Sequence, residues 1–205
     1  MEFLAHLWLP ILVSGVVVWI VSFLCWMVIG HHKKDTLAIP KESEFIDTIR
    51  RMGIAPGDYM FPEPQSCRGM TKEERTRWAK EKWVAGAMGH LRVWADPSMS
   101  LNMFLTFLFF LVASAVLAYL GWAVLPHGSI IGVNVGGTTI AAGMAPTFAK
   151  VFQVIATGGI LAYCFASFPN DLWFQKSRRA MVMNFIDGVV YALITATIFA
   201  YFWPK

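Results

Sequence analysis

The sequence is short of charged residues, and those that it has are unevenly distributed. Only 15% of the 205 residues are Asp, Glu, Lys or Arg, whereas soluble domains carry about 25%. Of these 30 charged residues, 22 lie between His31 and Pro97, and long stretches elsewhere contain none. The pattern argues against a soluble globular domain and predicts an all-α membrane protein with several membrane-spanning helices.

The sequence also lacks the motifs of most enzymes and metal sites. Its three cysteines, Cys25, Cys67 and Cys164, form no Cys-x-x-Cys pair and no zinc-type Cys/His pattern. It has no Walker loop, no G-x-S-x-G, no H-E-x-x-H and no G-x-G-x-x-G after a strand. None of the five histidines falls in the middle of a hydrophobic stretch, where a membrane haem would require one. We therefore expect no catalytic residue, no cofactor and no metal, and interpret the histidines as solvated residues near the membrane surfaces.

Four apolar stretches are long enough to cross a bilayer. We predict spans at residues 3–29, 101–125, 146–168 and 180–203, with Pro126 and Pro169 ending the second and third. Residues 10–29 alone would give about 30 Å of helix, the thickness of the hydrocarbon core. The first span follows an acidic residue and precedes no Ala-x-Ala site, so we expect it to be retained rather than removed as a signal peptide.

The basic residues predict which connections face the cytoplasm. Of the 17 Lys and Arg residues, 12 lie in the connection at 30–100 and three in the connection at 169–179, whereas the connection at 126–145 has none. By the positive-inside rule the first two are cytoplasmic and the third is an outer loop. Both termini are then periplasmic, in a bacterial inner membrane.

The cytoplasmic connection contains short helices and a distinctive loop. Residues 43–53 form an amphipathic pattern that Ser43 can cap and Gly53 can close, and Thr71 with Glu74 predicts a capping box for a second helix. Between them, "MGIAPGDYMFPEP" at 52–64 presents large side chains from a backbone stiffened by proline. We interpret it as a docking loop that contacts a neighbouring protein, or alternatively its own helices or the lipid surface. Its candidate residues are Pro56, Gly57, Tyr59, Phe61 and Pro62.

Small residues recur every four positions in the last two spans. Because helices in lipid gain little from burying leucine against leucine, close approach through small side chains favours their association. We therefore expect these spans to form an antiparallel pair. The predicted contact faces are Gly188, Ala192, Ala196 and Ala200 in the fourth span, and Gly158, Ala162 and Ala166 in the third.

A polar stripe runs beside the small face of the fourth span. It consists of Asn184, Asp187, Tyr191 and Thr195, at spacings of three, four and four residues. Asp187 is the one acidic residue well inside a span, and such residues are functional candidates. The alternative is a structural aspartate that bonds across the bundle to Asn184, Tyr163 or Thr106. No second carboxylate, histidine or lysine is placed deep enough to continue a proton relay.

Three motifs together resemble a known family. The opening "LWLPILVS", the central "APGDYMFP" and the closing "DGVVYALITATIFAYFWP" are similar to an uncharacterised family of small four-span bacterial inner-membrane proteins. The resemblance covers most of the chain, and its most specific part is the central tyrosine–proline motif. It implies a bacterial origin and four spans, and no activity.

These observations favour a non-catalytic accessory subunit of a larger respiratory or photosynthetic membrane complex. Its partners would be the lipid bilayer and other integral membrane subunits, bound through small-residue helix faces and the cytoplasmic loop. Nucleic acid is not expected, because the basic residues of the large connection alternate with ten acidic ones. The alternative is a small homo-oligomeric transporter or channel in which the polar stripe of the fourth span lines the path. A lipid-modifying enzyme has no motif to support it.

Overall fold

The chain divides into two compact units. The computed structural model describes residues 2–63, 67–84, 88–126, 131–135, 138–142 and 145–204. Unit 1 comprises Met1–Leu37 and Met99–Lys205, and unit 2 comprises Ala38–Ser98. The division follows the sequence, since unit 2 holds most of the charged residues and unit 1 most of the apolar ones.

Unit 1 contains four helical runs that are long and apolar enough to cross a membrane. The first is α1 (Glu2–Phe23), which continues as the π-helical turn η1 (Leu24–Ile29), and the second is α4 (Met99–Val124). The third is α5 (Phe148–Ile160) with the π-helical turn η5 (Leu161–Phe165) and α6 (Phe168–Trp173), and the fourth is α7 (Arg178–Phe202). The prediction of a multi-pass membrane protein with four spans is therefore confirmed.

The third run continues beyond the residue expected to end it. Pro169 occupies the first turn of α6, where a proline lacks no helical hydrogen bond and its fixed φ suits the helix. It therefore starts a short helix instead of ending the span.

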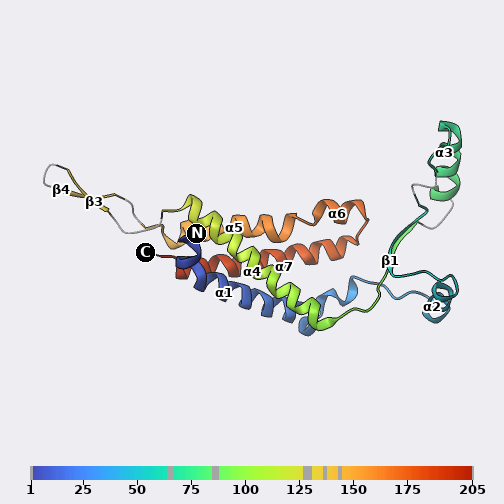
Figure 1. Cartoon of the computed structure of the whole chain (residues 1–205), viewed down its shortest axis with the longest axis horizontal. Coiled ribbons are helices and arrows are strands. Elements are labelled where there is room, and N and C mark those ends of the chain that lie inside the picture. The colour runs from blue at the N-terminus through green and yellow to red at the C-terminus, as the bar shows by residue number, and fades with distance from the viewer. Residues whose placement is uncertain are drawn as a thin grey trace. The chain divides into compact units, whose positions relative to one another are not determined.

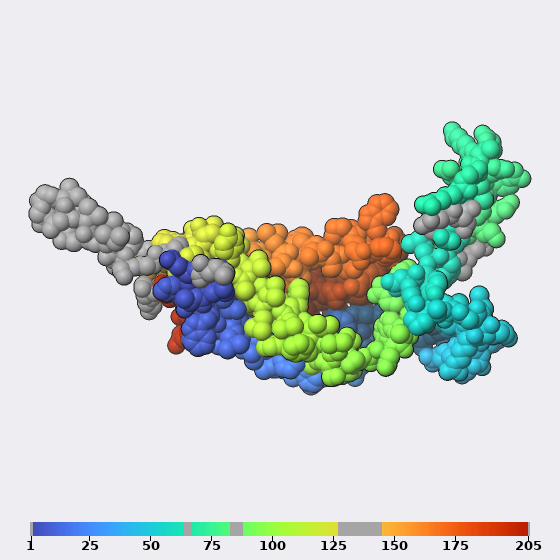
Figure 2. All heavy atoms as spheres, viewed as in Figure 1, coloured from blue at the N-terminus to red at the C-terminus, as the bar shows by residue number. Residues whose placement is uncertain are grey.

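The four helices form a closed ring in which each packs on two others. α1 contacts α4 and α7, and α5 contacts the same two helices. Successive helices run in opposite directions, so both termini lie at one end of the bundle (Figure 1). The space-filling view shows α1, α4 and α5 in contact along one face (Figure 2).

The half of the bundle nearest the termini is filled with apolar side chains. Its buried cluster draws on all four long helices and includes Leu7, Leu117, Val151, Ile155, Phe199 and Trp203. Nearer the middle, the buried Ser14 hydroxyl bonds to the carbonyl of Pro10 at 2.6 Å and to the hydroxyl of Ser114 at 3.0 Å. This contact joins α1 to α4 and satisfies both hydroxyls, which would be costly to bury unpaired.

Small residues bring α5 and α7 close together, but the residues of the third span at this contact differ from those predicted. A Cβ atom built on Gly159 would lie 2.9 Å from that of Ala192, and one built on Gly188 would lie 2.9 Å from the carbonyl oxygen of Tyr163. Gly158, predicted on this face, faces leucine side chains of α4 instead, and Ala162 is exposed. The predicted series of small residues in the third span began at Gly158, whereas the glycine that faces α7 is Gly159.

The connection between α4 and α5, predicted to be an outer loop, contains two antiparallel strands. These are β3 (Ile131–Val135) and β4 (Thr138–Ala142), with Val133 opposite Ile140.

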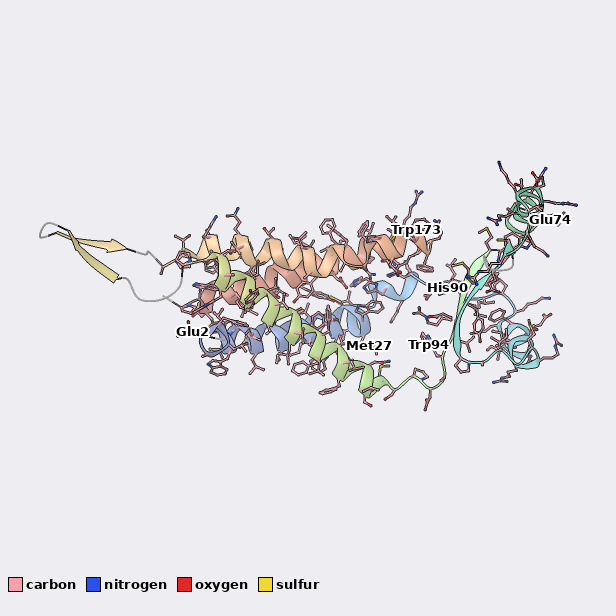
Figure 3. All side chains as sticks on the ribbon, turned by 45° about the horizontal axis from the view of Figure 1, so that its top comes forward. Glu2, Met27, Glu74, His90, Trp94 and Trp173 are labelled. Atoms are coloured by element: carbon pink, nitrogen blue, oxygen red, sulfur yellow. The ribbon has the colours of Figure 1, made fainter. Side chains whose placement is uncertain are left out.

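Unit 2 consists of two helices and a two-stranded sheet. The helices are α2 (Glu42–Arg51) and α3 (Lys72–Ala79), the latter followed by the π-helical turn η4 (Lys80–Val84). Charged side chains surround α3 near Glu74 (Figure 3). The predicted capping box of Thr71 and Glu74 is present. Ser43 does not cap α2, because the helix begins two residues earlier than predicted, at Glu42, with Lys41 at the cap position in a left-handed conformation.

The segment predicted to be a docking loop is a strand over part of its length. β1 (Gly57–Phe61) pairs antiparallel with β2 (Gly89–Val93), with Tyr59 opposite Leu91. Pro56 precedes β1 and Pro62 follows it, as expected of residues that cannot donate to a strand ladder. The prediction of a loop was wrong because the pairing partner lies about 30 residues away, in a glycine-containing segment with no clear pattern of its own.

Within the sheet, Arg92 and Asp58 form an ion pair. The guanidinium Nε donates to the Asp58 carboxylate at 2.5 Å, and both side chains are exposed. This hydrogen bond and the charge of Arg92 lower the pKa of Asp58 below its ordinary value.

We predict that replacing Gly159 with alanine destabilises the bundle more than replacing Gly158. At Gly159 the new methyl group meets Ala192, including its backbone, whereas at Gly158 it meets only the ends of Leu117 and Leu120. Overpacking of this kind costs about 1–3 kcal/mol. Unfolding in mixed detergent should show the difference. Both changes replace a glycine with alanine in the same helix and so alter helix propensity equally. Equal unfolding free energies for G158A and G159A would therefore contradict the close contact of Gly159 with Ala192.

We predict that Asp58 titrates at a lower pH in the wild-type protein than in the Arg92→Gln variant. Because the folded-state pKa is lowered, the pairing stabilises unit 2 above the unfolded-state pKa, and this is lost as pH falls through the folded-state value. The carboxyl ¹³C shift of Asp58, followed by NMR on the detergent-solubilised chain, measures both titrations. Identical midpoints in the two proteins would exclude the ion pair.

Candidate functional site

The candidate site lies where the chain leaves α1 and turns back toward α7. The π-helical turn η1 ends with the amide of Gly30 donating to the carbonyl of Cys25 at 3.2 Å. Gly30 then adopts a left-handed conformation, with φ of 63°, which a residue without a Cβ reaches at little cost. The following 3₁₀ turn η2 (His31–Lys34) thus places two adjacent histidines at the end of the bundle. Such π-helical turns occur often at functional sites.

Both histidines contact the one aspartate buried in α7. His31 Nε2 lies 3.1 Å from Asp187 Oδ1, and His32 Nε2 lies 3.0 Å from Asp187 Oδ2. The Tyr191 hydroxyl, one turn further along α7, lies 3.4 Å from Asp187 Oδ2. The side chains of His32 and Asp187 are 3% and 7% exposed and that of His31 is 23% exposed. The carboxylate is therefore shielded from solvent and surrounded by hydrogen-bond donors.

A second layer of charged residues holds His32 in place. Its other ring nitrogen, Nδ1, lies 2.6 Å from Asp35 Oδ2, and its ring stacks on that of Trp26 with centroids 3.9 Å apart. Arg179 forms an ion pair with Asp35, and its Nη2 also donates to the carbonyl oxygen of His31 at 2.7 Å. The turn after α1 is thus tied to the first turn of α7 by backbone as well as side-chain contacts.

The residues around Asp35 favour its ionised form. Partial burial disfavours its ionised form, but the hydrogen bond from His32 and the charge of Arg179 outweigh this effect and lower the pKa of Asp35 below its ordinary value. His32 therefore contacts a carboxylate through each ring nitrogen, which is satisfied when both nitrogens donate. Arg179 supplies a positive charge beside Asp35, and His31, His32 and Tyr191 surround the Asp187 carboxylate with hydrogen-bonding partners, as buried carboxylates require.

A cleft of about 340 Å³ borders the same aspartate. It lies between α4 on one side and η5 and α7 on the other, within the hollow visible between these segments (Figure 2). Both polar and aromatic side chains line it, among them Trp26, Thr106, Tyr163, Asn184, Asp187 and Tyr191. The site can therefore accept a small molecule or water beside the carboxylate.

The structure places the predicted polar stripe inside its own bundle. Asp187, Tyr191 and Thr195 are buried, and Asn184 is half-buried beside the cleft. Gly188, Ala192 and Ala196 are also buried, since they belong to the face of α7 that packs on α5 or toward the core. Of the predicted small residues of the third span, Ala162 lines the cleft and Gly158 faces α4.

The partners expected for Asp187 were wrong. Asn184 and Thr106 lie beside the cleft, whereas the Asp187 carboxylate contacts His31, His32 and Tyr191. The interpretation of His31 and His32 as solvated residues was also wrong, because the turn at Gly30 directs both rings back toward α7. Only the spacing of His32 and Asp35 within "GHHKKD" hinted at a local pair.

Of the predicted docking residues, Gly57, Tyr59 and Phe61 lie in β1, with Pro56 before it and Pro62 after it. They belong to unit 2 and take no part in the site at Asp187.

Comparison of the chain with family models, with curated proteins and with solved structures finds no match. The family resemblance carried by the three sequence motifs thus stays a prediction, and the function must be inferred from the geometry.

We predict that Arg179→Gln destabilises the protein, whereas Arg178→Gln does not. Arg179 joins Asp35 and the His31 carbonyl to α7, while the neighbouring Arg178 is exposed. Hydrogen bonds of charged groups contribute about 1.5–3 kcal/mol. Since Arg179 is 39% exposed, solvent screening reduces the expected loss to about 1–2 kcal/mol.

Thermal unfolding of both variants, purified in the same detergent, measures this difference. Both substitutions remove one positive charge at the start of α7, so Arg178→Gln controls for the effect of charge on the helix. Equal unfolding temperatures for the two variants would show that Arg179 does not hold the turn.

Proposed function

We propose that this chain is a non-catalytic accessory subunit of a larger membrane complex, anchored by the four helices of unit 1 and docked to a partner protein through unit 2. The observation that supports this most is the surface of unit 2. Among its residues with described burial, none is buried. A unit with so little interior is not expected to be stable unless another surface covers its apolar side chains.

The elements of unit 2 lead to the same expectation. α2 has ten residues, and a helix of that length is marginal alone in water. An isolated two-stranded sheet is marginal as well. These two elements and the residues directly after them nevertheless carry exposed apolar and aromatic side chains: Ile46, Met52, Tyr59, Met60, Phe61 and Trp94. Aromatic residues and methionine are enriched at the centres of protein interfaces.

The charge of unit 2 favours a protein partner over the lipid surface. Residues 38–98 contain ten Lys and Arg residues and nine Asp and Glu residues. Segments that bind anionic lipid headgroups carry a clear excess of basic residues. A nearly neutral surface with apolar side chains fits an integral membrane subunit with a matching apolar face.

The proposal also includes the orientation of the chain in the membrane. With unit 2 and the connection at 169–179 on the cytoplasmic side, 15 of the 17 basic residues lie on that side. Both termini are then periplasmic, since they lie together at the other end of the bundle (Figure 1).

The alternative of a homo-oligomeric transporter receives less support from the geometry. Asp187, Tyr191 and Thr195 are buried within one bundle, so they do not line a path between copies. Inside the bundle, the apolar cluster around Leu117, Ile155 and Phe199 separates this polar region from the end that holds the termini. Replacing Asp187 with asparagine discriminates the two: a transporter would lose flux while still folded.

Extraction of native membranes in several mild detergents, followed by native electrophoresis and mass spectrometry, tests the docking proposal. We predict that the wild-type chain migrates with a second protein in fixed proportion, and that Met60→Asp releases it. Thr76→Asp, on the polar helix α3, adds the same charge at an exposed position and should leave the complex intact. Migration of the wild-type chain as a lone 23.0 kDa species in every detergent would contradict the proposal.

A further inference from the structure

We propose that His31, His32 and Asp187 bind a divalent first-row transition-metal ion such as Zn²⁺. Each residue offers one ligand atom, and these atoms all lie within 4.8 Å of one another. The inference is independent of the docking function proposed for unit 2, because all three residues belong to unit 1.

The distances suit a metal ion with little rearrangement. Each histidine Nε2 lies 3.0–3.1 Å from an oxygen of the Asp187 carboxylate. A tetrahedral zinc ion with bonds of about 2.0–2.2 Å holds neighbouring ligand atoms about 3.3–3.6 Å apart. Each of these two nitrogen–oxygen contacts needs to lengthen by only a few tenths of an ångström, and the three ligand atoms already lie within 4.8 Å of one another. The metal then takes the place of the protons that the imidazoles now share with the carboxylate, and its binding releases protons.

The surroundings of His32 are those of a metal ligand. Its Nδ1 faces the carboxylate of Asp35 at 2.6 Å, so Nε2 is the nitrogen directed at Asp187. Metal-bound histidines commonly donate their second ring N–H to a carboxylate, which fixes the ring and makes the ligand more basic. Arg179 holds Asp35, and Trp26 stacks on the imidazole. The ring is therefore oriented before any metal arrives.

The ligand set defines the class of ion. Two imidazoles and one carboxylate suit Zn²⁺ and its neighbours in the first transition row, whereas Mg²⁺ and Ca²⁺ prefer oxygen ligands alone. Three protein ligands also leave a coordination position open, as in zinc sites that bind water or a small ligand. The cleft beside Asp187 provides space for that ligand, and His31, the most exposed of the three, lies on the side open to solvent.

The experiment uses full-length protein in detergent, without a histidine tag, treated with a chelator and then dialysed. Titration with CoCl₂ should give one equivalent of bound Co²⁺, with the d–d absorption bands of a low-coordinate site with nitrogen ligands, and ZnCl₂ should displace it. Zn²⁺ should also raise the unfolding temperature, because it binds only the folded chain.

Variants assign the binding to these residues. Asp187→Asn, close in shape to the native residue, and His31→Gln should each abolish the saturable absorption. Asp35→Asn should weaken Co²⁺ binding by about 10–100-fold, the usual effect of losing a partner of a metal-bound histidine. His6→Gln, beside Trp122, and His90→Gln, in unit 2, are the matched controls and should bind Co²⁺ as the wild type does.

Circular dichroism verifies that each variant remains folded, and His31→Gln is the variant most expected to do so, since His31 is partly exposed. If folded wild-type protein binds no Co²⁺ or Zn²⁺ saturably, protons alone hold the cluster and the proposal is overturned. Unchanged binding in both Asp187→Asn and His31→Gln would overturn it equally.

Discussion

The contact of Asp187 with His31 and His32 constrains the rest of unit 1. A carboxylate buried within a bundle is tolerated only when donors and positive charge surround it, and α7 alone supplies one hydroxyl. The remaining donors come from the turn after α1, more than 150 residues earlier in the chain. Pairing them fixes where that turn lies, and therefore how α1 ends relative to α7.

The two ends of the bundle are built on different principles. The end near the termini is apolar and depends on shape, with Gly159 and alanines allowing α5 and α7 to approach closely. The opposite end is polar and depends on pairing, with Asp187 surrounded first by histidines and then by Asp35 and Arg179. The apolar cluster blocks a continuous path along the bundle, so the cleft at the polar end is a pocket that opens on one side only. Such a pocket suits the binding of an ion better than its transport across the membrane.

The sequence predicted the elements that depend on composition and failed where distant residues meet. The four spans followed from the absence of charge, and the capping box at Thr71 followed from local spacing. Gly158 and Gly159 could not be distinguished, because one residue of helix rotation changes the neighbour. β1 was missed since its partner β2 is remote, and the histidine contacts were missed since they require the left-handed turn at Gly30. Asp187 stood out as an unusual buried acid, but its partners could be identified only once the chain was folded.

The most direct test of the central claim is the imidazole ¹⁵N spectrum of chelator-treated, histidine-labelled protein, with and without the Asp187→Asn substitution. If the carboxylate is bonded to both rings, the ε2 nitrogens of His31 and His32 should shift while the resonances of His6 and His90 remain in place. Resonances of His31 and His32 that do not respond to the substitution would show that the two histidines do not meet Asp187.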